Sequence, residues 1–241
     1  MEKDTRYELL DKASISADQI SRPSVSYWKD AWRRFRKDKL AMFGLVMILI
    51  VSLFAIFGPM LCPYDYDEAD FFSIAQWPSK AHWFGTDALG RDLYVRVLYG
   101  ARISLSIGVV AALVNMIIGV LYGGIAGYFG GKVDMLMQRF LEVANGIPRL
   151  VIVTLLLLVL QPGMITIIFA LMLTEWVGMS RIARAEMLKL KDQEFVLASR
   201  TLGAGSFFII FKEVLPNIIG PIITQVMFSI PTAIFTEAFL S

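Results

Sequence analysis

The residue types that most often carry catalysis or bind metals are sparse in this sequence. Its only cysteine is Cys62 and its only histidine is His82, so the chain can form neither an internal disulfide nor a metal site with several such ligands. Asp87 and Asp92 follow His82 closely and could be imagined as an acid–base site. Hydrolysis needs a nucleophile with its base, or a metal cluster. We therefore interpret this group as an exposed structural turn.

ATP hydrolysis is also not expected from this chain alone. The sequence has no Gly-x-x-x-x-Gly-Lys-Ser/Thr pattern, which is the loop that wraps nucleotide phosphates. If the function needs ATP, separate subunits must bind it.

Composition indicates a membrane protein. Hydrophobic residues make up 56% of the chain and charged residues 18%, with a mean hydropathy of +0.62, whereas soluble domains carry about 25% charged residues. A membrane-spanning helix needs about 20 apolar residues. Three charge-free runs of at least this length predict spans at Leu40–Leu61, Ile103–Gly131 and Val214–Thr236. Because the first run begins only at Leu40, we expect an anchor there and no cleavable leader.

The middle of the sequence allows two interpretations. Leu150–Thr174 is free of charge and could be one helix, but the Gln-Pro-Gly turn at 161–163 interrupts it. The alternative is two spans, Met135–Leu160 with a kink at Pro148, and Met164–Ser180.

Basic residues favour the second interpretation. One cluster precedes the first span and comprises Lys29, Arg33, Arg34, Arg36, Lys37 and Lys39. The positive-inside rule places this cluster in the cytoplasm. A second cluster comprises Arg181, Arg184, Lys189, Lys191, Arg200 and Lys212, and it returns to the cytoplasm only if the middle forms two helices.

We therefore predict an all-α polytopic helical bundle with five spans. The predicted divisions are a cytoplasmic N-terminal tail at 1–39, a first transmembrane anchor at 40–61, an extracytoplasmic loop at 62–102, and a core at 103–241 that contains a cytoplasmic segment at 180–212.

Small and polar residues in the second predicted span indicate helix packing. Gly119, Gly123 and Gly127 recur at four-residue spacing, which places them on one helix face that another helix can approach closely. Asn115 in the same span needs a polar partner in the membrane. Interhelical hydrogen bonding and the lining of a transport pathway both remain open for it.

The cytoplasmic segment has its own helix pattern. We predict a helix at Arg181–Leu190, a polar break at 191–193, and a second short helix that ends at Gly203. Asp192 is the expected N-terminal cap of the short helix. Gly203 is expected to adopt the left-handed conformation that ends it.

The short helix carries an apolar stripe. Phe195, Ala198 and Leu202 recur at positions i, i+3 and i+7, and Ser206 is placed to cap the helix that follows. Such a helix could be a lid, could lie on lipid, or could dock into a partner's groove. Periodicity does not choose among these.

The residues of this segment resemble a known motif. Glu194–Gly203 followed by Val214–Asn217 is similar to the "EAA" coupling loop of ABC importer permeases. The matching positions are Ala198, Gly203, Leu215 and Pro216, and the departures are Leu197, Ser199 and Glu213.

Three other stretches resemble one branch of that family. His82–Asp92 with Tyr99–Leu105 looks like the stretch before the core of oligopeptide, dipeptide and nickel permeases. The segment ahead of the first span resembles the start of the C-type subunit through Tyr27, Trp28, Arg33, Arg34 and Phe35. Val133–Pro148 also fits, so the resemblance runs from about residue 26 to the end.

The resemblance implies a bundle of the type I ABC importer permease kind, with a sixth span expected in the complete subunit. It implies an inner-membrane permease subunit that couples ATP hydrolysis by its partners to the import of oligopeptides or dipeptides. The implied partners are a second homologous permease subunit, two ATP-binding subunits and an extracytoplasmic substrate-binding protein. The implied ATPase-coupling residues are Glu194, Phe195, Ala198, Arg200, Leu202, Gly203, Leu215 and Pro216.

No cofactor, metal or nucleic acid is expected on this chain, and ATP and Mg are expected in the partner subunits. The alternatives are an ABC importer of nickel or another small solute, a secondary transporter or channel, and a membrane enzyme. A secondary transporter normally places ionisable residues at mid-membrane depth. The three clearest spans contain none, which counts against that alternative.

Overall fold

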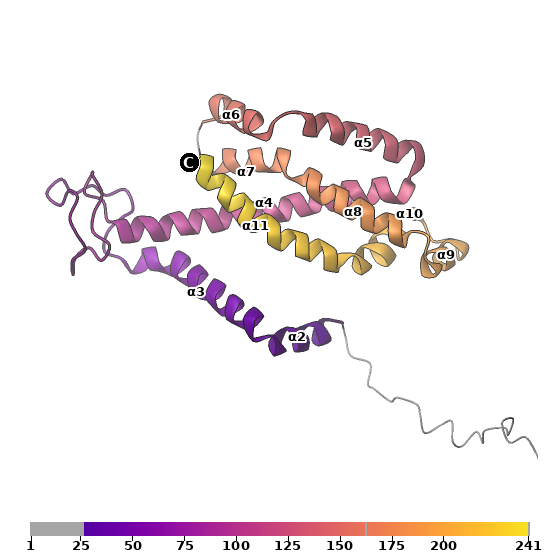
Figure 1. The fold of residues 1–241 in the computed structure, drawn as a ribbon, viewed down its shortest axis with the longest axis horizontal. Coiled ribbons are helices and arrows are strands. Elements are labelled where there is room, and N and C mark those ends of the chain that lie inside the picture. Colours follow the sequence, from indigo (N-terminus) through magenta and orange to yellow (C-terminus); the bar gives the residue numbers. More distant parts are fainter. Residues whose placement is uncertain (1–26, 162, 241) are drawn as a thin grey trace, which may run out of the picture. The chain divides into compact units, whose positions relative to one another are not determined.

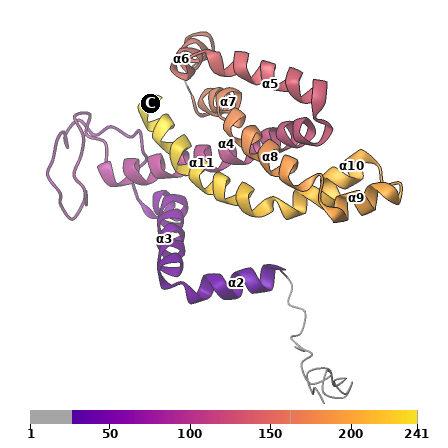
Figure 2. The same cartoon turned by 45° about the vertical axis from the view of Figure 1, so that its right-hand side comes forward.

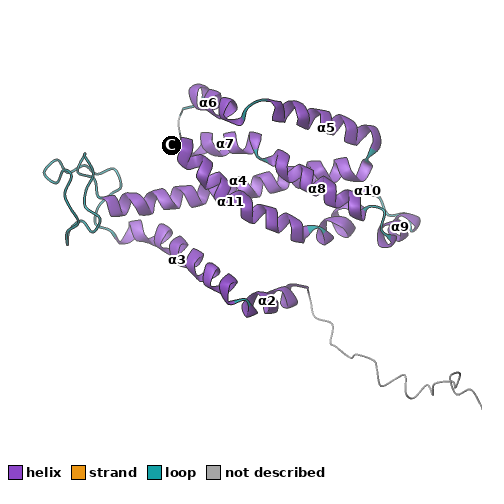
Figure 3. Cartoon of the chain, viewed as in Figure 1, coloured by secondary structure: helices purple, strands orange, loops and turns teal. Residues whose placement is uncertain are grey.

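The computed structural model describes residues 27–161 and 163–240, and the regular elements in those ranges are all helices (Figure 3). The predicted all-α fold is therefore confirmed. The part of the predicted N-terminal tail at residues 1–26 lies outside the described residues. The chain divides into two units that meet between Val51 and Ser52, and each unit is described by itself.

The first unit contains α2 (Tyr27–Lys37) and the beginning of α3 (Lys39–Leu61). Helix α2 was not predicted from the sequence. It is strongly amphipathic, because Trp28, Trp32 and Phe35 recur at i, i+4 and i+7 among basic residues.

The 23-residue helix α3 (Lys39–Leu61) corresponds to the first predicted span. Asp38 caps its start, since Oδ1 accepts hydrogen bonds from the amides of Leu40 at 2.9 Å and Ala41 at 3.1 Å. The helix is apolar on all sides and most of its side chains are exposed. A helix of this kind is stable against lipid and not against water.

The second unit is a helical bundle. Its elements are α4 (Leu93–Phe129), α5 (Gly131–Gly146), α6 (Arg149–Val159), α7 (Met164–Thr174), α8 (Trp176–Leu190), α9 (Glu194–Thr201), α10 (Ser206–Phe208), a π-helical turn (Ile209–Val214), a 3-10 turn (Leu215–Asn217) and α11 (Ile219–Leu240). The long helix α4 is central, and α7, α8 and α11 pack along it (Figures 1 and 2).

Four helical stretches are long and apolar enough to cross a membrane: Lys39–Leu61, Leu93–Phe129, Met164–Leu190 and Ile219–Phe239. The pair α5 and α6 adds a fifth span if it is counted as one, although it bends by 71°. The prediction of a kink at Pro148 therefore understated the bend. The reason is local, because Ile147 before the proline is forced into an extended conformation, with φ −87° and ψ 126°.

The second predicted span began too late. Helix α4 starts at Leu93 rather than at Ile103, so the loop before it ends at residue 92 and not at 102. A 37-residue helix is roughly 55 Å long, well beyond a hydrocarbon core of about 30 Å. The absence of charge marks the stretch that lipid can cover, whereas the helix itself continues past Arg96 and Arg102.

The loop before α4 is ordered by buried polar contacts. The side chain of Asp92 caps α4 by accepting a hydrogen bond from the Val95 amide at 3.0 Å. Its other carboxylate oxygen lies 2.8 Å from Nδ1 of His82. Only 7% of His82 and 4% of Asp92 is exposed, so the prediction of an exposed turn was wrong at these two residues. The pair holds the base of the loop onto the helix.

Asp87 organises the part of the same loop that directly precedes α4. Its carboxylate accepts hydrogen bonds from the amides of Leu89 at 2.8 Å and Arg91 at 3.0 Å, and from Nε of Arg91 at 2.8 Å. Partial burial raises the pKa of Asp87, but these hydrogen bonds and the Arg91 charge outweigh it and hold that pKa below its ordinary value.

Candidate functional site

The three glycines of α4 face α8 across a very close contact. A Cβ on Gly119 would lie 2.6 Å from Cβ of Met179, and one on Gly127 would lie 2.8 Å from Cβ of Met187. A Cβ on Gly123 would overlap the α8 backbone itself. The two helices therefore meet backbone to backbone over this stretch, which fixes the position of α8.

The helix predicted at Arg181–Leu190 begins earlier, at Trp176. Residues 180–190 are not a separate surface helix, because they belong to α8 (Trp176–Leu190), whose Ser180, Ala183 and Met187 are buried in the bundle. Arg184 of the same helix reaches Asp134 of α5 with both Nε and Nη2, at 2.5 Å each. The polar break predicted at 191–193 is confirmed between the end of α8 and the start of α9.

The short helix α9 (Glu194–Thr201) is present, with a different cap from the predicted one. Its N-cap is Gln193, without a side-chain hydrogen bond, so the assignment of Asp192 as the cap was wrong. At its other end Gly203 has φ +84°, the left-handed conformation expected of it. Ser206 is the first residue of α10 and does not cap that helix.

Helix α9 has one buried face and one exposed face. Val196 is fully buried in a core cluster that includes Ile209 and Val214. On the other side, 38% of Phe195 and 88% of Leu202 is exposed, and Ala198 between them is exposed as well. The apolar stripe recognised in the sequence therefore points away from this chain.

The other residues assigned to coupling occupy different environments. Glu194 is exposed at the start of α9, whereas the Arg200 guanidinium lies 5.0 Å from the centroid of the Tyr128 ring, at the end of α4. Leu215 is half-buried and Pro216 is exposed in the 3-10 turn. Pro216 therefore precedes the last span, which begins at Ile219.

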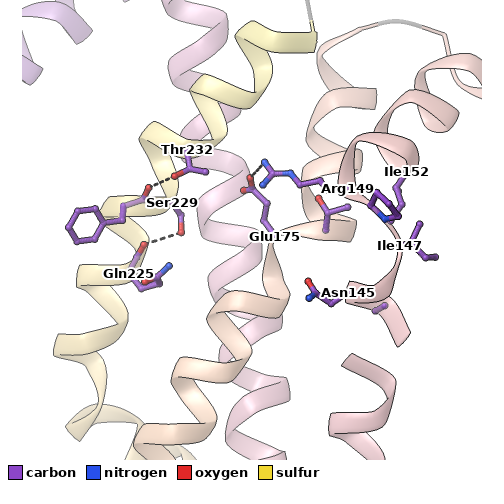
Figure 4. Close-up of a pocket in the computed structure, with 12 residues that line it drawn as sticks. Asn145, Ile147, Arg149, Ile152, Glu175, Gln225, Ser229 and Thr232 are labelled. Atoms are coloured by element: carbon purple, nitrogen blue, oxygen red, sulfur yellow. Dashed lines mark hydrogen bonds and ion pairs between the residues drawn. The ribbon is translucent and has the colours of Figure 1, made fainter. Parts of the chain in front are cut away.

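A polar pocket at the other end of α8 was missed by the sequence analysis. It has a volume of about 360 Å³ and lies where the α5–α6 bend, the start of α8 and one face of α11 meet (Figure 4). Its polar lining includes Asn145, Arg149, Glu175, Gln225, Ser229 and Thr232.

An ion pair between Arg149 and Glu175 lies at the pocket wall. Nη2 of Arg149 donates to Oε1 of Glu175 and also, at 2.5 Å, to Oγ1 of Thr236. Asn115 of α4 donates from Nδ2 to Oε2 of Glu175 at 3.3 Å, and its own Oδ1 has no partner among the described residues. Arg149 of α6 and Asn115 of α4 thus both donate to the carboxylate of Glu175, and Asn115 serves as an interhelical hydrogen-bond donor.

A second buried acid in a span is Glu237 of α11, which accepts a hydrogen bond from Oγ of Ser104 at 2.7 Å. The absence of charge in the three clearest predicted spans therefore does not extend to the whole bundle. The available signal was the presence of Glu175 inside the predicted span Met164–Ser180 and of Arg149 directly after Pro148. Both residues are visible in the sequence, but their pairing is not.

Comparison with known proteins identifies the family. Residues 119–241 match the family described as binding-protein-dependent transport system inner membrane component, and residues 26–78 match the N-terminal TM domain of oligopeptide transport permease C. The dipeptide transport system permease protein DppC of Bacillus subtilis is 50% identical over 238 residues, which cover 99% of this chain and 74% of the relative.

Two further relatives agree. The oligopeptide transport system permease protein OppC of Bacillus subtilis is 50% identical over 225 residues, covering 93% of this chain and 74% of the relative. OppC of Escherichia coli K12 is 39% identical over 218 residues, covering 90% and 72%. The resemblance inferred from the motifs is thereby confirmed, and the chain belongs to the binding-protein-dependent transport system inner membrane component family as a multi-pass permease subunit.

Proposed function

We propose that this chain is one of two membrane subunits of an ATP-driven peptide importer, and that α9 couples it to partner ATPases. The observation that carries the proposal is the exposed stripe of Phe195, Ala198 and Leu202 on a helix whose opposite face is buried. An apolar helix face of this kind is suited to a groove on another protein. The relatives named for dipeptide and oligopeptide transport support a peptide cargo.

The attachment of α9 suits the transmission of force. Val196 is buried with side chains of the π-helical turn, and Arg200 lies over Tyr128 of α4. Movement of a protein bound to the stripe is therefore passed to α4 and to the turn that leads into α11. In this mechanism ATP binding closes the two ATPases, and the spans alternate between outward and inward access.

The remaining parts of the complex follow from the same proposal. A second homologous permease subunit completes the pore, and an extracytoplasmic binding protein delivers the peptide. ATP and Mg are held by the ATPases and not by this chain. The N-terminus and α9 lie in the cytoplasm, which the two basic clusters support. An importer of nickel or another small solute is the alternative within the family, and the names of the relatives favour peptides.

The test is purification of the subunit from its native membrane in mild detergent, with the bound proteins identified by mass spectrometry. We expect two ATPases and a second permease. Ala198→Trp should abolish recovery of the ATPases and retain the permease, because the bulky ring prevents the stripe from seating. Ala81→Trp is the matched control, since Ala81 is also exposed but lies in the loop at the far end of α4 (Figure 1).

Two results would count against the proposal. One is recovery of the subunit alone under every gentle condition. The other is recovery of the ATPases with Ala198→Trp at the level of the unaltered protein.

A further inference from the structure

The polar pocket contains hydrogen-bond donors that the chain itself does not use. Arg149 has five N–H donors, and the two on Nη2 are directed at Glu175 and Thr236. The donors on Nη1 and Nε have no acceptor among the described residues. The Arg149 side chain is 37% exposed, whereas that of Glu175 is 8% exposed. The ion pair with Glu175 therefore fixes the guanidinium through Nη2, while Arg149 lines the pocket with donors that the chain does not use.

The other polar side chains that line the pocket are uncharged and partly unpaired. The hydroxyls of Ser229 and Thr232 donate to carbonyls of their own helix, at 2.9 Å each, so their lone pairs stay available as acceptors. The side-chain amides of Asn145 and Gln225 make no hydrogen bond within the described chain. Figure 4 shows these groups around the space next to Arg149. Together they can satisfy both the N–H and the C=O groups of an amide ligand.

The backbone around the pocket supports the same interpretation. The helix path breaks by 71° between α5 and α6, directly before Arg149. In a membrane, non-helical backbone is tolerated only where it is buried in protein or lines a cavity. Ile147 and Pro148 at the break line the pocket, so the interrupted backbone lies at a cavity.

We propose that this pocket binds the C-terminal carboxylate of the transported peptide through Arg149; the inference rests on the proposed peptide import. Charge-assisted hydrogen bonds from a guanidinium to a carboxylate are among the strongest in proteins. Glu175 balances the charge of Arg149, so the empty pocket carries no uncompensated cation. A volume of about 360 Å³ is at the lower end of ligand sites. It accommodates the end of a peptide and not a long chain.

The test uses the complete transporter, with its binding protein and ATPases, reconstituted in proteoliposomes. Uptake of radiolabelled trialanine is compared with uptake of trialanine amide, which lacks the terminal charge. The binding protein has its own preference between the two peptides, so each variant is expressed relative to the unaltered transporter for the same peptide. We expect Arg149→Gln to lower uptake of the acid about tenfold more than uptake of the amide.

Two further variants separate binding from folding. Arg149→Gln leaves Glu175 buried without its partner, so the double variant Arg149→Gln/Glu175→Gln is also measured, after size-exclusion chromatography shows that the complex is assembled. It should show the same selective loss for the acid. Arg139→Gln is the matched control, because Arg139 is an exposed arginine outside the pocket, paired with Glu142 of its own helix. It should change uptake of neither peptide.

The outcomes are distinct. If the unaltered transporter takes up neither peptide, the proposed function is wrong. If it takes up peptides but the assembled double variant loses acid and amide equally, or loses neither, the carboxylate site is refuted and peptide import stands. If the effect of Arg149→Gln is equal for both peptides and appears only in vesicles containing phosphatidylglycerol, the pocket binds a lipid headgroup, which also refutes the inference.

Discussion

The close contact between α4 and α8 makes a prediction that one methyl group can test. In Gly123→Ala the new Cβ would overlap the carbonyl of Ser180 and lie 2.8 Å from the backbone N of Arg184. These neighbours are main-chain atoms of a buried helix, so they cannot rotate away as a side chain would. Overpacking of this kind costs about 1–3 kcal/mol, which exceeds the gain of up to about 1 kcal/mol in helix propensity when alanine replaces glycine.

The adjacent glycine is the control. A Cβ on Gly124 would lie 3.5 Å from Cε of Met187, which is ordinary contact with the end of a flexible side chain. Gly124→Ala should therefore keep its propensity gain. In thermal unfolding of the purified protein in detergent, Gly123→Ala should melt several degrees lower, at about 2–4 °C per kcal/mol for a chain of this size, and Gly124→Ala should melt at or above the unaltered protein. Equal melting temperatures for the two variants would refute the packing argument.

Three other expectations follow from single side chains. Val196→Ala should cost about 1–3 kcal/mol and speed amide hydrogen exchange throughout α9, whereas Leu197→Ala on an exposed position should leave it unchanged. Asp92→Ala removes both the cap of α4 and the buried contact with His82, so it should cost more than the roughly 1 kcal/mol of a cap alone, with faster exchange in the first turn of α4 and around His82. Asp87→Asn should make the loop at 62–92 easier to proteolyse at pH 7. The folded pKa of Asp87 is depressed, so the stabilisation of the loop by its carboxylate is complete above about pH 4 and is lost as the pH falls through that pKa. The proteolysis rates of the two proteins should therefore converge in acid. A constant difference between the rates at every pH would contradict this.

The membrane-spanning helices were predictable because lipid imposes a condition on composition alone. A run such as Leu40–Leu61 cannot be stable anywhere else, and the structure places α3 within one residue of it. The same condition says nothing about helix ends beyond the lipid. The start of α4 is marked by one hydrogen bond from the Val95 amide to Asp92. The composition of the sequence does not reveal which residue makes such a contact. Helix α2 was missed because its apolar residues are few and lie within a strongly charged segment.

The candidate functional residues were also predictable only in part. The stripe on α9 follows from helical periodicity, so its residues were recognised, although periodicity did not reveal which face is buried. The pairing of Arg149 with Glu175 joins positions 26 residues apart, and it exists only because α5 bends sharply before α6 and α7 gives way to α8 at Glu175. Neither the bend angle nor the packing of those helices is encoded in a local sequence pattern. Arg149 and Glu175 could therefore be recognised from the sequence only as separate charges, and not as a pair.

The two candidate regions are joined by one element. Helix α8 begins directly after Glu175 at the pocket and ends at Leu190, a few residues before α9. Its 15 residues span about 22 Å, and the glycine contacts clamp it to α4 along most of that length. A clamped pair cannot slide, so a displacement of α9 by a partner must move α4 and α8 as one body. If the proposed function is correct, the chain then bends where α7 is interrupted before α8, at Glu175. This residue forms the ion pair with Arg149. Engagement of the ATPases would therefore alter the geometry of the carboxylate site without any contact to it, and Gly123→Ala, which loosens the clamp, should weaken ATP-driven uptake more than it weakens ATP hydrolysis.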